Sequence, residues 1–233
     1  VIRKNVFCRG NRPGNNTAIQ IYCPTLVEHN IIYDCVDGIE GKGGGNTIRH
    51  NVVFRCSGAE TMSNRSGSNN LFENNLLFEN TLAWEIYSGS NNTWRKNTVL
   101  NCRMIARIKR GGPGGFRKML LENNLFSANR RGFSFEDVTC PVDHIHFHKN
   151  TFIGGGKIET EGRGHYRETD RVEQSNWPKN QGVKHVFALL YKLAPMAGPS
   201  GGHVDLADAL SGPAARDVRS GGRPPTAEQL HRP

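Results

Sequence analysis

Acidic, phenolic and basic side chains alternate with apolar residues in four short segments of this sequence. The segments are residues 38–40, 84–87, 106–108 and 133–136. Successive side chains of a strand point to opposite faces, so the apolar residues are predicted to face a core and the polar residues to face outward. The predicted outward residues are Glu40, Glu85, Tyr87, Arg107, Ser134 and Glu136. Carboxylates, a phenol and a guanidinium group in one stripe suit a sugar-binding groove, with an ordinary solvated face as the alternative.

One reaction open to such side chains is cleavage of a uronic-acid chain by β-elimination. The substrate carboxylate must be neutralised, the adjacent C5 proton removed and the leaving oxygen protonated. Arg65 is a permanent cation that can neutralise a carboxylate through two hydrogen bonds but is a poor base. Tyr87 carries a phenol, whose ordinary pKa of about 10 could be lowered by nearby Arg residues so that it serves as both base and acid. Arg65, Tyr87 and Arg107 are the predicted catalytic residues.

Glycoside hydrolysis is a second reaction that the sequence leaves open. It uses two carboxyl groups roughly 5 to 9.5 Å apart. Candidate carboxyl groups belong to Glu40, Glu60, Glu85 and Glu136. Carboxylate oxygens also bind Ca²⁺, and Glu60 with Glu85 is the predicted site for a calcium cofactor.

Basic residues are concentrated in residues 101–131. The whole chain has a net charge of +9, and this stretch holds eight Lys or Arg residues with one acid, Glu122, which gives a local charge of +7. A basic loop attracts polyanions, and the sequence contains no nucleic-acid recognition motif. An acidic polysaccharide is therefore the predicted partner and nucleic acid is not expected, with a merely basic soluble surface as the alternative. The predicted substrate-binding residues are Glu40, Glu85, Lys109, Arg110 and Glu136.

A repeated pattern determines where these side chains lie. Seven Asn residues recur at intervals of 21 to 27 residues, each with a hydrophobic residue three positions before it and another two positions after it. These anchor residues are Asn5, Asn30, Asn51, Asn75, Asn97, Asn124 and Asn150. The earlier hydrophobic residues are Ile2, Val27, Ile48, Phe72, Trp94, Leu121 and Phe147, and the later ones are Phe7, Ile32, Val53, Leu77, Val99, Phe126 and Phe152. A constant local pattern with a variable period indicates stacked units with insertions in their loops.

The composition of the repeat predicts short strands. Leucine-rich repeats share the period but need several Leu residues and a helical half, whereas these units are rich in Asn, Gly, Thr and β-branched or aromatic residues. We therefore expect an all-β solenoid. Its anchor Asn residues are expected to occupy turns with left-handed backbone angles and to bond to one another as a ladder.

The position five residues after each anchor Asn forms a second predicted column. It contains Gly10, Cys35, Cys56, Asn80, Cys102, Asn129 and Gly155. Three of the six Cys residues would thus stack, and a column of small, buried free thiols is the favoured interpretation. Disulfides between adjacent rungs roughly 4.8 Å apart are the alternative, so the redox compartment stays open.

Over residues 1–160 the pattern resembles the right-handed parallel β-helix family, pectate-lyase-like in the broad sense. Residues 60–66, Glu-Thr-Met-Ser-Asn-Arg-Ser, also resemble the Glu-x-x-Ser-Asn-Lys-Ser motif of the alginate lyase and chondroitinase B family. That resemblance implies a polysaccharide lyase with a Lys as base and an Arg one coil later. Arg65 stands at the Lys position, and Tyr87 or Ser88 stands at the Arg position. The adjacent Asp pairs of β-helical polygalacturonases are absent, which favours a lyase over a hydrolase.

The repeat does not run to the end of the chain. We expect residues 1–160 to form a β-helix that lacks its N-terminal part, because the chain begins inside a repeat and solenoids need caps. Residues 161–219 are expected to form a C-terminal cap or irregular segment, in which 183–193 could be a final strand or cap, and 220–233 a disordered tail.

The cellular setting follows from the resemblance rather than from a targeting signal. The sequence contains neither a transmembrane run nor a signal peptide, and the resemblance implies a secreted or periplasmic bacterial protein. We expect a monomer without a membrane partner. A non-catalytic carbohydrate-binding or structural scaffold is the alternative to an enzyme, since a binding-only descendant would show departures such as those at Arg65 and Tyr87.

Overall fold

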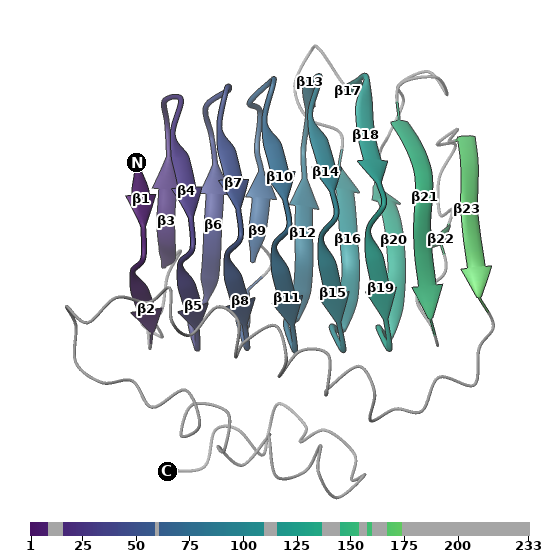
Figure 1. The fold of residues 1–233 in the computed structure, drawn as a ribbon, viewed down its shortest axis with the longest axis horizontal. Coiled ribbons are helices and arrows are strands. Elements are labelled where there is room, and N and C mark those ends of the chain that lie inside the picture. Colours follow the sequence, from purple (N-terminus) through teal and green to yellow (C-terminus); the bar gives the residue numbers. More distant parts are fainter. Residues whose placement is uncertain are drawn as a thin grey trace, which may run out of the picture.

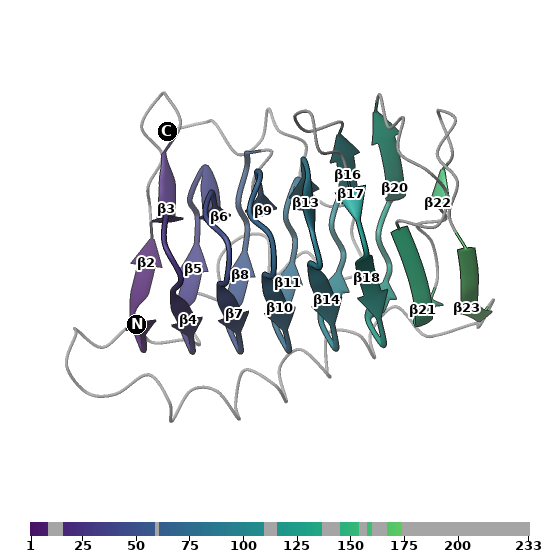
Figure 2. The same cartoon turned by 90° about the horizontal axis from the view of Figure 1, so that it is seen from above.

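The protein folds as a parallel β-solenoid. The computed structural model describes residues 1–8, 16–58, 61–109, 116–136, 145–153, 158–159 and 167–173. Every strand pair among these residues is parallel (Figure 1). The described residues contain no helix, and therefore no helix that is long and apolar enough to cross a membrane. The strands of successive coils lie side by side along one axis (Figure 2).

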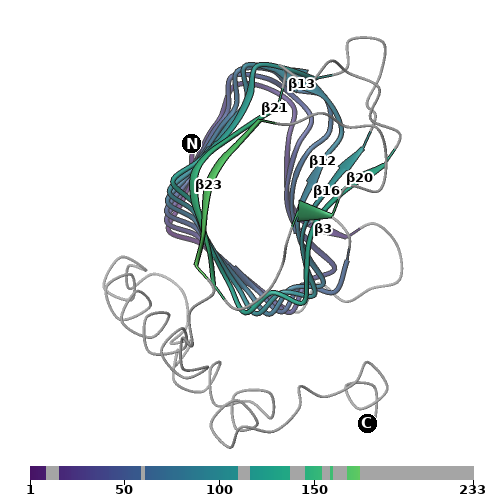
Figure 3. The same cartoon turned by 90° about the vertical axis from the view of Figure 1, so that its right-hand side faces the viewer.

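Three faces enclose the core, and Figure 3 looks along the axis that they share. The first face contains β1 (Ile2–Arg3), β4 (Leu26–Glu28), β7 (Thr47–Arg49), β10 (Leu71–Glu73), β14 (Thr93–Arg95) and β18 (Met119–Glu122). The second face contains β2 (Val6–Cys8), β5 (Ile31–Tyr33), β8 (Val52–Phe54), β11 (Leu76–Phe78), β15 (Thr98–Leu100) and β19 (Leu125–Ser127). The third face contains β3 (Thr17–Ile21), β6 (Asp37–Gly41), β9 (Met62–Asn64), β12 (Leu82–Ile86), β16 (Met104–Lys109), β20 (Arg131–Glu136) and β22 (Ile158–Glu159).

The remaining strands join or extend these faces. The long strand β21 (Ile145–Ile153) pairs with both β18 and β19, and so runs across the first and second faces. β23 (Arg167–Glu173) pairs with β21 beyond it. The segment 161–219, which was expected to be a cap or irregular, thus contains a strand, whereas residues 183–193 and the expected tail 220–233 lie outside the described residues. A small third sheet pairs β13 (Gly89–Ser90) with β17 (Phe116–Arg117).

The anchor Asn residues form one continuous ladder, as predicted. Each Nδ2 donates to Oδ1 of the next anchor at 2.8–3.1 Å, from Asn5 through Asn150. The same Oδ1 atom also accepts from the backbone N–H of the preceding anchor, at 3.0 Å between Asn51 and Asn75. The Asn side chains and backbone N–H groups inside the turn therefore hydrogen-bond to one another. These bonds are needed because the ladder is buried from water from Asn30 onward.

The predicted backbone conformation of the anchors is wrong by one residue. The left-handed φ angles belong to the residues just before the anchors. These are Lys4, His29, His50, Asn74, Lys96, Asn123 and Lys149. The anchor amide must point along the axis at the next Asn, so the chain changes direction one residue earlier, where the side chain can point to solvent.

The core has the predicted register. The inward residues of the third face that were predicted from alternation are all buried: Ile39, Trp84, Ile86, Ala106, Ile108, Phe133 and Phe135. On the first face Phe72 and Trp94 pair across the strands, and their rings stack in parallel with centroids 4.8 Å apart. The apolar residues of all three faces form one cluster along the axis.

The cysteine column is buried and free of disulfides. Cys35, Cys56 and Cys102 have free thiols, and Sγ of Cys102 lies 3.4 Å from the Leu100 carbonyl oxygen. Burial raises the pKa of the Cys102 thiol to about 12. Asn80 and Asn129 belong to the same column, and their Oδ1 atoms accept from the backbone N–H groups of Cys56 and Cys102 at 2.9 Å.

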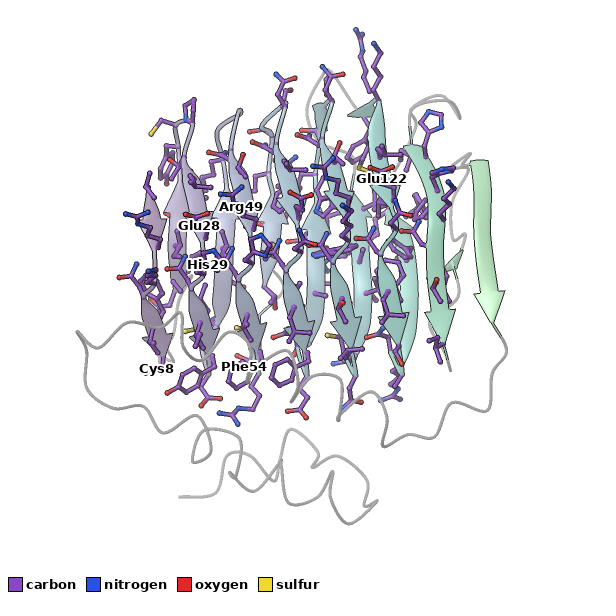
Figure 4. The ribbon with its side chains drawn as sticks, in the orientation of Figure 1. Cys8, Glu28, His29, Arg49, Phe54 and Glu122 are labelled. Carbon is purple, nitrogen blue, oxygen red and sulfur yellow. The ribbon has the colours of Figure 1, made fainter. Side chains whose placement is uncertain are left out.

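A second apolar cluster lies on the outward side of the second face. We call it the outer apolar stripe. Its members are Ile31, Tyr33, Val52, Phe54, Leu76, Phe78 and Leu100. The rings of Tyr33, Phe54 and Phe78 stack along the axis with centroids 5.1 and 4.6 Å apart, and Phe54 projects away from β8 in Figure 4. Because the neighbouring residue Val53 belongs to the core cluster, alternation directs the stripe outward.

Candidate functional site

The outward side of the third face carries two adjacent columns of polar side chains. The pairing of β3, β6, β9, β12, β16 and β20 stacks the first column in register. It consists of Gln20, Glu40, Ser63, Glu85, Arg107 and Ser134. The second column, two residues further along each strand, consists of Tyr22, Lys42, Arg65, Tyr87, Lys109 and Glu136. Together these residues form what we call the acid–base cluster.

Glu40 is the first of two buried carboxylates in this cluster. It faces away from the core, yet only 2 % of the residue is exposed. Arg65 Nε lies 2.9 Å from its Oε1, and Lys42 Nζ lies 3.3 Å from its Oε2. Gln20 Nε2 donates to Oε2 at 2.8 Å. Two cations and an amide thus hold both oxygens, as a buried carboxylate requires.

Glu85 is the second buried carboxylate, and it is fully buried. Its Oε1 forms ion pairs with Arg107 and, at 3.2 Å, with Lys109 Nζ. Its Oε2 accepts a hydrogen bond of 3.0 Å from the Tyr87 hydroxyl. Lys109 also lies 3.8 Å from Glu136 at the edge of the cluster. A phenol, a guanidinium group and an ammonium group therefore converge on one carboxylate.

Tyr87 connects the two halves of the cluster. The Arg65 guanidinium carbon lies 5.1 Å from the centre of its ring, and Lys109 Nζ lies 5.4 Å from the same centre. Cations at this distance from a ring are attracted by its π electrons, and they would also stabilise a negative charge on the phenol oxygen. Arg65 therefore links the Glu40 half to the Glu85 half through Tyr87.

Tyr22 repeats the arrangement of Tyr87 at the other end of the columns. Its hydroxyl donates to Gln20 Oε1 at 3.0 Å and accepts from Lys42 Nζ at 3.3 Å, while the same Nζ lies 5.3 Å from the ring centre. The hydrogen bond with Tyr22 is the main cause that raises the pKa of Lys42. Tyr22 differs in being exposed and in donating to an amide rather than to a carboxylate.

Ser63 occupies the rung between the two carboxylates. Its pairing partners are Glu40 on one side and Glu85 on the other. The side chain is fully buried and its Oγ has no hydrogen-bond partner, and the same is true of Thr61 Oγ1 two residues earlier. Since adjacent rungs lie 4.7–4.9 Å apart, the backbones that carry Glu40 and Glu85 are roughly 9 to 10 Å apart.

The predicted site residues that the structure describes lie on one face. Tyr87 and Arg107 contact Glu85, Arg65 contacts the Tyr87 ring, and Glu40, Lys109 and Glu136 join them through ion pairs. Glu60 and Arg110 lie outside the described residues. No group of three or more His, Cys, Asp or Glu side chains in the described ranges is arranged to hold a metal ion. Calcium binding by Glu60 and Glu85 stays a prediction, and the cations around Glu85 are Arg107 and Lys109.

Sequence reasoning missed part of the cluster. Gln20, Tyr22, Lys42 and Ser63 were not among the predicted site residues. Gln20 and Lys42 contact Glu40, Ser63 pairs with Glu85, and Tyr22 contacts Gln20 and Lys42. The signal was available, because the segment 17–22 alternates apolar and polar residues like the later copies.

A second set of charges on the first face was also missed. The residue two positions before each of the first six anchor Asn residues alternates in charge from rung to rung, and we call this column the charge ladder. Its members are Arg3, Glu28, Arg49, Glu73, Arg95 and Glu122. Figure 4 shows Glu28 and Arg49 close together on the first face, with Arg49 Nη2 2.7 Å from Glu28 Oε2. The side-chain hydrogen bond from Arg49 lowers the pKa of Glu28. Strict alternation pairs every charge with an opposite one, so this column is suited to stability rather than to a ligand.

The comparisons with known proteins agree with the fold. A family model described as a right-handed β-helix region matches residues 2–165. No curated protein and no solved structure matches the chain.

Proposed function

Because this chain belongs to the right-handed β-helix family, we propose that it acts on an acidic, uronic-acid-containing polysaccharide, as a lyase whose site is the acid–base cluster. The observation that carries the proposal is the position of Tyr87. Its hydroxyl donates to a buried carboxylate, Glu85, and its ring contacts both Arg65 and Lys109. This arrangement gives one phenol a proton acceptor and two cations that favour its anionic form.

The proposed reaction assigns one task to each part of the cluster. Tyr87 first passes its hydroxyl proton to Glu85, which lies at hydrogen-bond distance. The phenolate oxygen then takes the C5 proton of the uronate, the C5 electron pair forms the C4–C5 double bond, and the C4–O bond breaks. The leaving oxygen takes up the proton from the Tyr87 hydroxyl, and Glu85 then returns its proton to the phenolate oxygen, which restores both side chains.

Neutralising the substrate carboxylate falls to the exposed side of the same cations. The Arg65 side chain is 38 % exposed while its Nε is bonded to Glu40, so the guanidinium group is oriented by a buried partner and accessible from outside. Lys109 is likewise oriented by Glu85 and partly exposed. A pre-oriented guanidinium group loses less side-chain entropy when it binds a carboxylate.

The geometry favours elimination over glycoside hydrolysis. Hydrolysis needs one carboxylic acid that donates a proton and a second carboxylate. Glu40 and Glu85 both accept from cations, and Glu85 also accepts from Tyr87. Neither is therefore arranged as the proton donor of a hydrolase.

The test is incubation of the wild type with alginate, pectate and glycosaminoglycans while the absorbance of unsaturated products is followed. Tyr87→Phe should keep binding and abolish product formation, since it removes only the hydroxyl. Tyr33→Phe is the control, because it removes a phenol hydroxyl from β5 on the second face, outside the acid–base cluster, and should leave turnover unchanged. A wild type that binds none of these polymers, or a fully active Tyr87→Phe, would contradict the proposal.

Binding without catalysis is the second candidate. It is favoured by the full burial of Ser63 and Glu85, which leaves the partly exposed cations as the part of the cluster that a ligand meets first. On this hypothesis the polymers bind to the wild type, no unsaturated ends appear, and Tyr87→Phe behaves like the wild type.

A further inference from the structure

The outward charged columns of this solenoid place opposite charges on successive coils. In the charge ladder, Arg95 Nε lies 2.8 Å from Glu73 Oε1. In the turn after the second face, Arg55 donates from Nε and Nη2 to the two carboxylate oxygens of Asp34, at 2.7 and 2.9 Å. Opposite charges on neighbouring rungs attract, whereas like charges directly opposite each other are destabilising. A stack of like charges is therefore an exception that calls for an explanation.

Arg103 and Arg130 form such a stack, in the turn that leads from the second face to the third. The Arg130 N–H group donates to the Cys102 carbonyl oxygen and the Arg131 N–H group to that of Arg103, both at 3.0 Å. Because Arg131 also pairs with Met104, Arg130 stands directly over Arg103. The two backbones are one rung apart, roughly 4.8 Å. We call these two residues the arginine pair.

The arginine pair has no acidic partner in the part of the chain that the structure describes. Both side chains are exposed, and neither guanidinium group has a hydrogen bond or an ion pair with a described residue. Lys42 and Arg65 are also stacked like charges, but they share the carboxylate of Glu40. The repulsion between Arg103 and Arg130 is therefore left to a bound anion to offset.

The arginine pair lies close to the acid–base cluster. Arg103 immediately precedes β16, and Arg107, which bonds Glu85, stands four residues further along the chain. At 3.2–3.4 Å per residue these two positions are roughly 13 Å apart. Lys109 is the last residue of the same strand. Cations are thus present at both ends of β16, and a single elongated anion can contact both.

The residues beside the arginine pair suit a sugar rather than a nucleobase. Asn101 and Ala128 each stand two residues before an arginine of the pair, and both are exposed. The Asn101 amide offers donors and an acceptor to hydroxyl groups, and the guanidinium groups offer paired donors to a carboxylate. Single-stranded nucleic acids are bound largely by stacking on aromatic side chains. Residues 101–104 and 128–131 contain no aromatic residue.

We infer that the arginine pair binds a carboxylate group of the same acidic polysaccharide chain that occupies the acid–base cluster. This inference rests on the proposed function, because the cluster determines the class of polymer that passes over β16. The bound carboxylate supplies the negative charge that the Arg103 and Arg130 stack lacks. The pair contacts a sugar unit away from Tyr87, so it contributes affinity and not a step of the reaction.

The experiment compares two double variants of the full chain that lose the same charge. Arg103→Gln with Arg130→Gln removes the arginine pair, and Arg49→Gln with Arg95→Gln removes two partly exposed arginines of the charge ladder. Alginate and pectate are titrated into both variants and the wild type at rising salt. Loss of the arginine pair should weaken polymer binding about ten-fold or more, because hydrogen bonds to charged groups contribute most of such a contact. The remaining binding should depend less on salt, and the ladder variant should bind within about two-fold of the wild type.

Thermal unfolding without polymer separates binding from a structural role. The variant without the arginine pair loses a repulsion and should melt at or above the wild-type temperature. The ladder variant loses the ion pairs of Arg49 and Arg95 and should melt lower. A lower melting temperature for the variant without the arginine pair would show that these arginines have acidic partners in solution, which overturns the inference.

The binding outcomes distinguish this inference from the proposed function. If the variant without the arginine pair bound alginate or pectate as tightly as the wild type does, the inference would fail and the proposed function would stand. A wild type that binds neither polymer would overturn both. Equal weakening in the two variants would indicate a general charge effect. Tighter binding of a single-stranded RNA, lost with the arginine pair, would indicate a different partner, and each of these last two results also overturns the inference.

Discussion

The guanidinium carbon of Arg65 lies 5.1 Å from the centre of the Tyr87 ring, one coil further along the solenoid. The same Arg65 holds Glu40 through Nε at 2.9 Å. Tyr87 in turn holds Glu85 at 3.0 Å. One cation–π contact therefore connects two buried carboxylates, and a substitution of Arg65 should alter the contacts of both Glu40 and Tyr87.

Arg65→Ala should weaken uronan binding about ten- to a hundred-fold, because a hydrogen-bonded charge contributes about 1.5–3 kcal/mol. Turnover should be lost together with binding. The matched control is Arg95→Ala on the first face, since Arg95 has a similarly exposed side chain and also bonds a carboxylate through Nε, that of Glu73. Titrations of both variants against the wild type provide the measurement, repeated at rising salt, which should weaken wild-type binding. Equal loss in both variants would mean that charge in general, rather than this site, attracts the polymer.

Asn75→Ala should destabilise the fold strongly. The Asn75 side chain donates to Asn97 and to the Ile48 carbonyl oxygen and accepts from Asn51. Its removal leaves several buried groups unpaired, each at a cost of about 1–3 kcal/mol, so a loss of about 3 kcal/mol or more is expected in chemical denaturation.

Asn5→Ala is the control for the ladder. Asn5 stands in the same column but is exposed, and its side chain makes its ladder contact only with Asn30 among the described residues. Its replacement should cost about 1 kcal/mol or less. If the two variants were equally stable, the ladder would contribute little beyond the backbone hydrogen bonds.

The sequence predicts the ladder and the core well because both follow one local rule. Each anchor Asn and its two hydrophobic neighbours, such as Phe72 and Leu77 around Asn75, obey constraints that every coil repeats. The outward columns follow no such rule. Their contacts depend on the register between neighbouring coils, which decides the residues that are stacked on one another. Arg65 and Tyr87 could be assigned to one face from alternation, but the cation–π contact between them needed the register.

The outer apolar stripe shows why the rest was not predictable. Ile31 and Tyr33 flank Ile32 so that the segment reads as one continuous apolar run, and alternation cannot tell which side is inside. Only the position of Ile32 in the core reveals that its neighbours face outward.

Trp94→Ala should cost about 3–5 kcal/mol of stability, the usual range for removing a large aromatic side chain from a core. Trp94 is fully buried and stacks on Phe72 at 4.8 Å. Trp94→Phe is the informative control, because the Trp94 Nε1 has no hydrogen-bond partner and its loss leaves no acceptor unpaired. Thermal or denaturant unfolding should show a much smaller effect for Phe than for Ala. A loss of stability in Trp94→Phe as large as that in Trp94→Ala would indicate that the Trp94 Nε1–H group donates a hydrogen bond in solution.

Thiol labelling should divide the five cysteines that the structure describes into two groups. Cys8 and Cys23 are exposed and should react with a maleimide in the native protein. Cys35, Cys56 and Cys102 are buried, and burial raises the pKa of the last two, so their reactive thiolate forms are scarce. Mass spectrometry of peptides from native and denatured protein gives the comparison. Rapid native labelling of Cys102 would contradict the buried column.

Glu79→Gln should stabilise the protein at neutral pH and have no effect at pH 3. Burial raises the pKa of Glu79 above its ordinary value, an effect that attraction to Arg55 only partly offsets. A carboxyl group with a raised folded-state pKa binds its proton more tightly in the folded state than in the unfolded state. At a pH below the unfolded-state pKa, the Glu79 carboxyl group is neutral in both states and does not change the free energy of unfolding. As the pH rises from there through the folded pKa, the unfolded state ionises first and stability falls, and the full penalty remains above the folded pKa.

Glu73→Gln provides the comparison of opposite sign. Glu73 is paired with Arg95 at 2.8 Å, so its replacement removes a surface ion pair and should cost about 0.2–1 kcal/mol at neutral pH. Melting temperatures of both variants and the wild type between pH 3 and pH 8 would separate the two cases. The curves for Glu79→Gln and the wild type should converge at low pH and diverge toward neutral pH. If they instead stayed parallel, burial of the Glu79 charge would not be the cause of the difference.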